Sequence, residues 1–140
     1  TADPFCRSPE HNRGVQDMVE SAKDGVEIVV SISVLNVIKE IENRLAHLKL
    51  AHSVLRDGGV LYAKVWAGLW PSRGTGASEE DPSRNSYQGH KWAIDYLAEV
   101  QAIFGPQNCF VDSQNDMIVA VKRKQVDFHE ADLSFNVRIV

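Results

Sequence analysis

The sequence VEIVVSI, from Val26 to Ile32, decides the fold together with a second apolar run, VLYAKVWA, at residues 60–67. The first run is short, β-branched and apolar at nearly every position, which is typical of a parallel strand that is buried on both faces. We therefore expect it in the centre of a sheet. A strand, a helix and a second strand in this order predict a right-handed parallel crossover, and hence an α/β fold.

The residues between the two runs have the periodicity of an amphipathic helix. Apolar side chains recur every three to four residues over 37–55, and Ser33 or Asn36 is the expected first residue of the helix. The Asp-Gly-Gly sequence at 57–59 is expected to end it, because glycine adopts the positive φ values that terminate helices.

Further elements extend outward from this centre. An amphipathic helix is predicted at 11–23, before Asp24-Gly25. Residues 68–89 form a polar loop that is longer than most structureless connections, and such loops are commonly functional. A helix at 90–104 and two antiparallel strands at 108–112 and 117–122 follow it.

At 140 residues with 44% hydrophobic content, the chain has the length of one domain. We divide it into an α/β domain at 1–124 and a tail at 125–140. In the tail, apolar and polar residues alternate as in a strand with one wet face, so it is a candidate for an extra or exchanged strand. The apolar members of this alternation are Leu133, Phe135, Val137 and Ile139. Because the sequence begins at Thr1, we expect that an upstream portion has been removed.

Charge and cysteine content limit the classes of partner. A net charge of −4 and scattered basic residues disfavour nucleic acid. Cys6 and Cys109 match neither a metal-ligand spacing nor a disulfide framework, and no segment has the pattern of a membrane span or a signal peptide. We therefore expect a soluble, cytoplasmic protein. His47 and His52, five residues apart on one helix, make a poor metal pair, so no metal site is expected.

The order strand, helix, Asp-Gly-Gly, strand, loop, helix and closing hairpin resembles the C-terminal portion of class I S-adenosylmethionine-dependent methyltransferases. The resemblance covers about residues 2–124. In that family a helix ending near a Gly-Gly pair feeds the fifth strand. More narrowly, Asp3-Pro4-Phe5, VLNVI at 34–38 and RNSYQ at 84–88 resemble a phage and bacterial group of methyltransferases of this fold.

This resemblance implies a Rossmann-like, mostly parallel sheet with an antiparallel C-terminal hairpin. It also implies methyl transfer from S-adenosylmethionine to an acceptor that the sequence does not identify. The glycine-rich cofactor turn and the first strand of the family have no counterpart in this sequence. A non-catalytic, truncated domain retained for assembly or regulation is therefore the alternative function.

The family's first strand lies beside the fourth, and its absence would leave residues 26–32 as an unpaired, apolar sheet edge. Three elements are candidates to cover that edge: an upstream polypeptide, a partner subunit that exchanges elements, or the alternating tail at 133–140. We therefore expect a homo-oligomer or a longer parent chain.

Four residues are candidates for binding the cofactor. Asp3 resembles the acidic residue that accepts hydrogen bonds from the cofactor ribose in this family, although a turn before Pro4 explains it equally well. Ser31, Ser33 and Asn36 follow the first apolar run, at the strand end where open α/β sheets bind ligands. The alternative for Ser33 and Asn36, capping of the next helix, is the commoner role of such side chains.

The long loop offers aromatic, cationic and amide side chains suited to a lid over a substrate. These are Trp70, Arg73, Thr75, Arg84, Asn85, Tyr87 and Gln88. His90, at the end of the loop, is a candidate general base, and the alternative is a solvated histidine at a helix start.

Residues 55–65 also resemble the fifth strand of ribose 2′-O-methyltransferases that act on RNA. Lys64 would match a catalytic lysine of that group and Asp116, loosely, its final acid. The aspartate expected at the end of the fourth strand is replaced by Ile32 or its serine neighbours, which removes the charge that would activate the lysine. Lys64 is otherwise a side chain that reaches solvent from a strand end. The motif of amino-methylating nucleic-acid enzymes is missing, which argues against base methylation.

Overall fold

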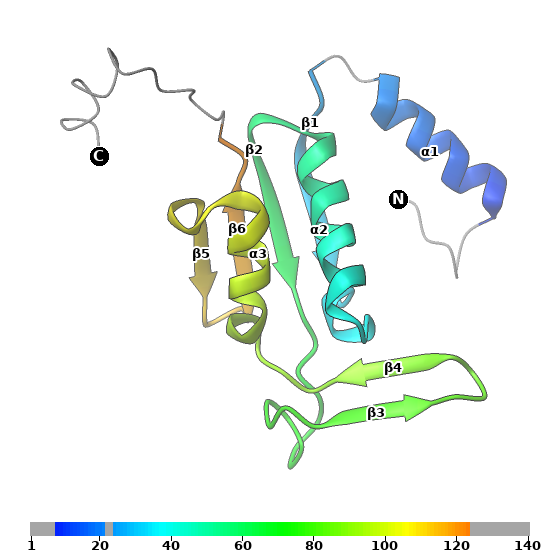
Figure 1. Cartoon of the computed structure of the whole chain (residues 1–140), viewed down its shortest axis with the longest axis vertical. Coiled ribbons are helices and arrows are strands. Elements are labelled where there is room, and N and C mark those ends of the chain that lie inside the picture. Colours follow the sequence, from blue (N-terminus) through cyan, green and yellow to red (C-terminus); the bar gives the residue numbers. More distant parts are fainter. Residues whose placement is uncertain (1–7, 22–23, 124–140) are drawn as a thin grey trace.

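A four-stranded sheet in the order β1-β2-β6-β5 organises the residues that the computed structural model describes, 8–21 and 24–123 (Figure 1). The strands are β1 (Val26–Ile32), β2 (Leu55–Lys64), β5 (Cys109–Asp112) and β6 (Met117–Val121). β1 and β2 are parallel, and β6 is antiparallel to both β2 and β5. The parallel pairing of the two apolar runs and the antiparallel closing hairpin are therefore confirmed, and the fold is mixed α/β.

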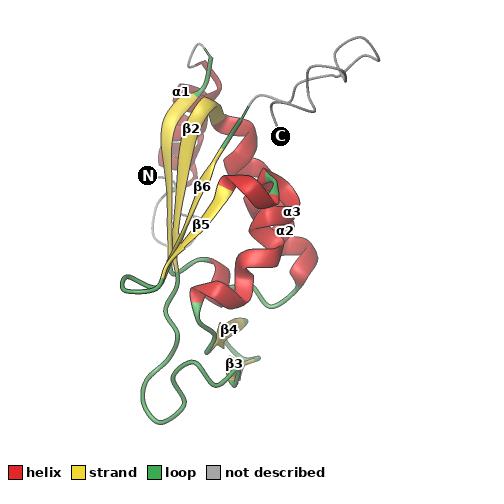
Figure 2. Ribbon diagram, turned by 90° about the vertical axis from the view of Figure 1, so that its left-hand side faces the viewer, coloured by secondary structure: helices red, strands yellow, loops and turns green. Residues whose placement is uncertain are grey.

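One layer of helices covers one face of this sheet (Figure 2). The helices are α1 (Pro9–Ser21), α2 (Ile41–Val54) and α3 (Leu97–Phe104), with the 3-10 turns η1 (Leu35–Val37), η2 (Ala93–Tyr96) and η3 (Pro106–Asn108). α2 and α3 form the layer, whereas α1 lies beyond β1 and apart from it (Figures 1 and 2). Among the described residues, no helix is both long enough and apolar enough to cross a membrane.

The core lies between the sheet and the α2–α3 layer. Alternate residues of β2 and β6, such as Leu61 and Ile118, point toward the helices and are fully buried. Leu48 of α2 and Val100 of α3 meet them from the other side and are equally buried. This alternation follows from the strand geometry, in which successive side chains point to opposite faces.

The opposite face of the sheet is open in the described part of the chain. Ile28, Val30 and Ile32 of β1 are 57%, 58% and 61% exposed, and Phe110 of β5 is 54% exposed. The expectation that β1 is central and covered on both faces is therefore wrong for the described residues. β1 is the edge strand there, because its only described neighbour is β2.

The Asp-Gly-Gly sequence at 57–59 lies inside β2 and does not end a helix, contrary to expectation. α2 ends at Val54 and β2 begins at Leu55, so the predicted strand at 60–67 starts earlier and ends at Lys64. Val26 pairs with Leu55 but Ile28 pairs with Val60, so β2 contains a bulge at this point. Within the bulge, Gly58 N–H donates to the Lys122 carbonyl (2.6 Å).

The predicted start of the helix before β2 is also wrong. Ser33 has a left-handed backbone (φ 57°) and Asn36 belongs to η1, whereas α2 begins at Ile41. Neither side chain caps a helix. Of the predicted helix at 90–104, only the part from Ala93 is helical, first as η2 and then as α3.

The predicted loop at 68–89 contains a two-stranded antiparallel sheet. β3 (Ser78–Asp81) pairs with β4 (Ser86–Gly89) below the main sheet (Figure 1). The expected tail strand at 133–140 lies outside the described residues.

A buried ion pair joins α2 to α3. The Arg44 guanidinium donates two hydrogen bonds of 2.8 Å to the Glu99 carboxylate and two more to the carbonyls of Ile38 and Lys39. The hydrogen bond with Glu99 raises the pKa of Arg44. This bidentate pair fixes the irregular segment before α2 against the second helix.

We predict that Leu61→Ala lowers the free energy of unfolding by about 2–5 kcal/mol, because it leaves a cavity between sheet and helices. Val30→Ala, on the open face of the neighbouring strand, is the matched control and should cost less than about 1.5 kcal/mol. Urea unfolding followed by circular dichroism measures both values. Equal losses for the two variants would show that the open face is covered in solution.

We also predict that Glu99→Gln destabilises the chain by about 3 kcal/mol, because it leaves the Arg44 charge buried without its counter-charge. Glu42→Gln, an exposed change near the start of α2, is the control and should change stability by less than about 0.5 kcal/mol. The same urea titration compares them, and a loss below about 1 kcal/mol for Glu99→Gln would contradict the importance of the pair.

Candidate functional site

The C-terminal ends of β1 and β2 lie side by side, with Ile32 opposite Lys64. We call this region, with the segments that follow the two strands, the carboxyl end of the sheet. Two contacts hold it together: Ser33 N–H donates to the Lys64 carbonyl (2.8 Å), and Trp66 N–H donates to Asn36 Oδ1 (3.3 Å). β4 packs against η1, so the hairpin after β2 also belongs to this end.

The three described cofactor candidates differ in what their side chains do. Ser31 is buried on the helix face of β1, where its hydroxyl is hydrogen-bonded to His47 Nε2 (3.0 Å). Asn36 is buried and its amide oxygen accepts from the backbone of Trp66. Ser33 is exposed at the carboxyl end of the sheet. Asp3 lies outside the described residues.

These positions test whether the described residues fit S-adenosylmethionine. The cofactor needs groups for its ribose and for its amino acid moiety, and of the three candidates only Ser33 presents a side chain to solvent. These three residues therefore do not by themselves form a site for this cofactor.

The predicted lid residues fall into two groups. The first lies in the turn after β2: Trp70 is 77% exposed, the Arg73 guanidinium stacks over the Trp92 ring (5.2 Å), and Thr75 Oγ1 donates to the Ser72 carbonyl (2.7 Å).

The second group lies on the β3–β4 hairpin. Arg84 is paired with Asp81 (3.6 Å), Asn85 occupies the turn with φ 50°, and Tyr87 and Gln88 are half-buried on β4. The Lys39 ammonium bonds to the Glu80 carboxylate (3.0 Å) and ties the hairpin to the segment before α2.

His90 is buried, with only 2% of its surface exposed, so the alternative of a solvated histidine is wrong. Its Nδ1 lies 2.6 Å from Ser72 Oγ, and its Nε2 lies 3.5 Å from Glu79 Oε1. The Trp66 ring packs edge to face against the His90 imidazole, with 5.4 Å between the ring centroids. Ser72 and Glu79 were not predicted as site residues, because neither their spacing nor their surroundings in the sequence connects them to His90.

The candidate residues of the ribose-methylating alternative do not form a charge pair with β1. Lys64 is exposed at the end of β2, and the β1 residue opposite it is Ile32. Asp116 has a structural contact instead: its Oδ1 accepts a hydrogen bond from Ala93 N–H (2.7 Å) at the start of η2.

Tyr96 lies under the same end of the sheet, on η2. Burial raises its pKa to about 12. Arg44 and Lys91 both approach its ring, with the guanidinium carbon and the ammonium nitrogen 5.7 and 5.9 Å from the centroid. The phenol is therefore protonated at physiological pH and is held as a packing and cation-binding group.

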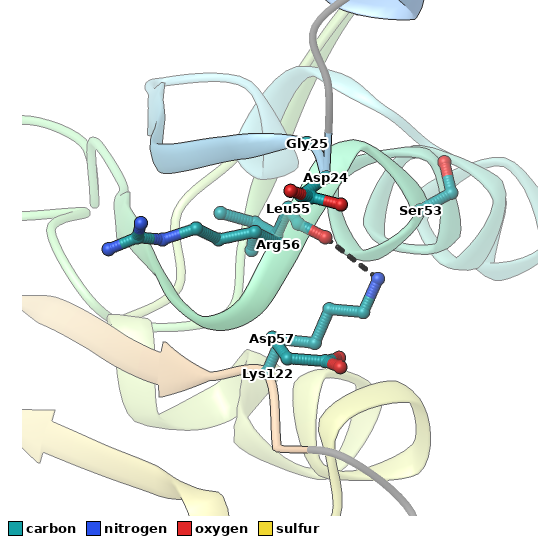
Figure 3. Close-up of a pocket in the computed structure, with 7 residues that line it drawn as sticks. All are labelled: Asp24, Gly25, Ser53, Leu55, Arg56, Asp57 and Lys122. Carbon is teal, nitrogen blue, oxygen red and sulfur yellow. Dashed lines mark hydrogen bonds between the residues drawn. The ribbon is translucent and has the colours of Figure 1, made fainter.

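A polar pocket lies at the opposite end of the sheet, where β1 and β2 begin (Figure 3). Its lining residues are Asp24, Gly25, Ser53, Leu55, Arg56, Asp57 and Lys122. Lys122 Nζ donates to the Leu55 carbonyl (2.8 Å), so this ammonium is already engaged in the bulge of β2. The pocket contains none of the predicted site residues.

Among the described residues, the best-defined polar constellation is thus the buried His90 with Ser72 and Glu79. Searches against protein-family models, curated proteins and solved structures find no match to the chain.

The burial of His47 predicts a pH dependence of stability. Burial lowers the pKa of His47 below its ordinary value of 6.5, so the unfolded chain binds this proton more tightly than the folded one. The contribution of neutral, buried His47 to the free energy of unfolding is therefore complete above pH 6.5 and decreases as the pH falls below that value. We expect His47→Gln to reduce this decrease in urea titrations between pH 7.5 and 5.5. An identical pH dependence in wild type and His47→Gln would contradict this prediction.

Proposed function

We propose that this chain supplies the second half of a Rossmann-like, S-adenosylmethionine-dependent methyltransferase domain. The observation that supports the proposal is the topology around β2. In the family that the sequence resembles, a helix ending near a Gly-Gly pair feeds the fifth strand, and a hairpin closes the sheet. Here α2 runs directly into β2, which pairs in parallel with β1, and the antiparallel β5–β6 hairpin lies on the other side of β2.

The free edge of β1 supports the same proposal. In the resembled family the first strand lies beside the fourth, which corresponds to the position next to β1. Beside this edge, on the open face of the sheet, three apolar side chains expose more than half of their surface to water: Ile28, Val30 and Ile32. Exposure of apolar surface of this size is energetically unfavourable. We propose that a further strand pairs with β1 and that a second layer covers this face. A second copy of the chain or a longer parent chain would provide both.

The cofactor and an acceptor would then bind at the carboxyl end of the completed sheet. In open α/β sheets this is the end at which ligands bind. The described residues would contribute one wall, formed by the segment around Ser33 and by the loop and hairpin that follow β2. The nature of the acceptor is left open.

One observation favours a second candidate, a non-catalytic methyltransferase-like domain that acts in assembly. The polar groups of Ser31 and Asn36 are committed to internal contacts and are not presented to a ligand. Ribose methylation of RNA has less support, since Ile32 lies opposite Lys64 and the chain carries a net charge of −4.

The test is a titration of the isotope-labelled chain with S-adenosylmethionine, followed by amide NMR. The proposal predicts small, saturable shifts of the amides around Ser33 and Ala67, with a dissociation constant of about 1 mM, because part of a site retains part of the affinity. Ser33→Gly, which keeps the left-handed backbone, should weaken these shifts. Ser53→Ala, at the opposite end of the sheet, is the control and should leave them unchanged.

Two outcomes would contradict the methyltransferase proposal. One is the absence of shifts at 5 mM cofactor (about five times the expected dissociation constant) in a chain that is folded by its own spectrum. The other is a set of shifts confined to the pocket around Asp57 and Lys122. Either would favour the assembly role.

A further inference from the structure

We propose that Ser72 is a nucleophile, activated by His90 and oriented by Glu79, that accepts acyl groups from small activated esters. The proposal concerns a chemistry separate from methyl transfer. It rests on the constellation of these three side chains and does not depend on the completion of the sheet.

The distances place the His90 imidazole between the Ser72 hydroxyl and the Glu79 carboxylate. Ser72 Oγ lies 2.6 Å from His90 Nδ1, a short hydrogen bond. On the other side of the ring, His90 Nε2 is buried, has no hydrogen-bond partner, and lies 3.5 Å from Glu79 Oε1. The carboxylate favours the tautomer that carries its hydrogen on Nε2, because that hydrogen then points toward negative charge. The lone pair of Nδ1 is left to accept the proton of the Ser72 hydroxyl.

The imidazole ring is fixed by its surroundings. Gly68 packs against it so closely that a Cβ at this position would lie 2.7 Å from His90 Cγ. The Trp66 ring closes another side. His90 N–H donates to the Ala77 carbonyl and its own carbonyl accepts from Gly76 N–H, both at 2.8 Å. The base is therefore held in one orientation, as catalysis requires.

Ser72 is fixed as well. Its carbonyl accepts from both Thr75 N–H (3.2 Å) and Thr75 Oγ1 (2.7 Å), which forms a tight turn. Gly74 N–H, inside that turn, donates to the Ala67 carbonyl (2.8 Å) and anchors the turn to the end of β2. These hydrogen bonds of the turn therefore fix the backbone that carries the Ser72 hydroxyl.

The exposure of the residues determines which atom meets a substrate. His90 is 2% exposed, whereas Ser72 is half-buried, so of these two residues the serine is the one that a substrate meets first. Leu69 and Trp70, just before it in the chain, are 71% and 77% exposed and offer apolar surface beside the turn. A short, apolar acyl group suits this surface.

The order of groups is that of a serine-histidine-acid triad with the two ring nitrogens exchanged. Ser72 Oγ bonds to the ester carbonyl carbon while its proton moves to His90 Nδ1. The carbon–oxygen bond to the alcohol breaks, and the departing oxygen takes that proton. Water then bonds to the acyl carbon, one of its protons passes through Nδ1 to Ser72 Oγ, and the acyl–serine bond breaks. An acid and an alcohol leave, and no other reactant is needed.

The test uses the full chain with a fluorophosphonate probe and with p-nitrophenyl acetate. We expect the probe to label Ser72 in the unmodified chain, as located by peptide mass spectrometry, and Ser72→Ala to lose both the label and the esterase rate. Glu79→Gln should lower the rate about tenfold, which is less than the roughly 10²–10⁴-fold typical of positioned proton transfer, since this carboxylate is largely exposed. Ser83→Ala is the control, because its hydroxyl bonds to Asp81 in the same loop and not to a histidine.

Two results would overturn the proposal. The first is an unmodified chain in which the probe labels other serines but not Ser72, or labels none. The second is a folded Ser72→Ala variant that keeps the esterase rate of Ser83→Ala. The peptide map needs no variant, so the assignment is tested even if Ser72→Ala fails to fold.

Discussion

The parallel hydrogen bonding of β1 with β2 is the constraint on which the rest of the described structure depends. It brings Ile32 and Lys64 to the same end of the sheet, and from there both following segments must leave the sheet together. The bulge in β2 adjusts this pairing at the other end, where Gly59 is required because a Cβ would lie 2.9 Å from the Arg56 carbonyl oxygen. Strand register and glycine placement thus fix where the segments that begin at Ser33 and Val65 leave the sheet.

A second consequence of this pairing is that the sheet is covered unequally. α2 connects β1 to β2 and α3 connects β2 to β5, and both pack on the same face (Figure 2). The other face has no such connection among the described residues. Burying a side chain such as Ile28 or Val30 contributes about 1.5–3 kcal/mol, so the open face is a considerable source of binding free energy for any element that covers it. An unpaired strand edge adjoins this face, and edges of this kind invite further strands.

The sequence was sufficient to predict the strong elements. β-branched runs and helical periodicity identified β1, β2, α2 and the closing hairpin, because these signals are local. The coverage of β1 was not predictable, since an apolar run has the same composition whether one face or both are buried. The predicted helix start was wrong because Ser33 and Asn36 have side chains typical of caps, but both residues are held by the chain at and after the end of β2. Ser33 N–H donates to the Lys64 carbonyl, and the Asn36 side-chain oxygen accepts from Trp66 N–H.

The candidate site was predictable in part for a related reason. Length and composition predicted a functional loop at residues 68–89, which stays a prediction, and His90 was singled out at its end. The β3–β4 hairpin escaped notice because its strands are short and polar, and its register depends on backbone pairing that no periodicity reveals. Ser72 and His90 are eighteen residues apart, and only the fold of the loop brings them together.

The loop and the open face are physically separable parts of the molecule. Trp66, Ser72 and His90 all lie on the chain that follows β2, and the contacts of His90 with Ser72 and with the Trp66 ring lie within that segment, together with backbone hydrogen bonds such as Gly76 to His90. Completion of the sheet would act on the far edge of β1 and would reach this loop through the segment that follows β1, where β4 packs against η1 and Lys39 is paired with Glu80. A strand added at β1 would therefore first change the surroundings of Ser33 and Asn36. The position of His90 would still be determined mainly by contacts within the loop.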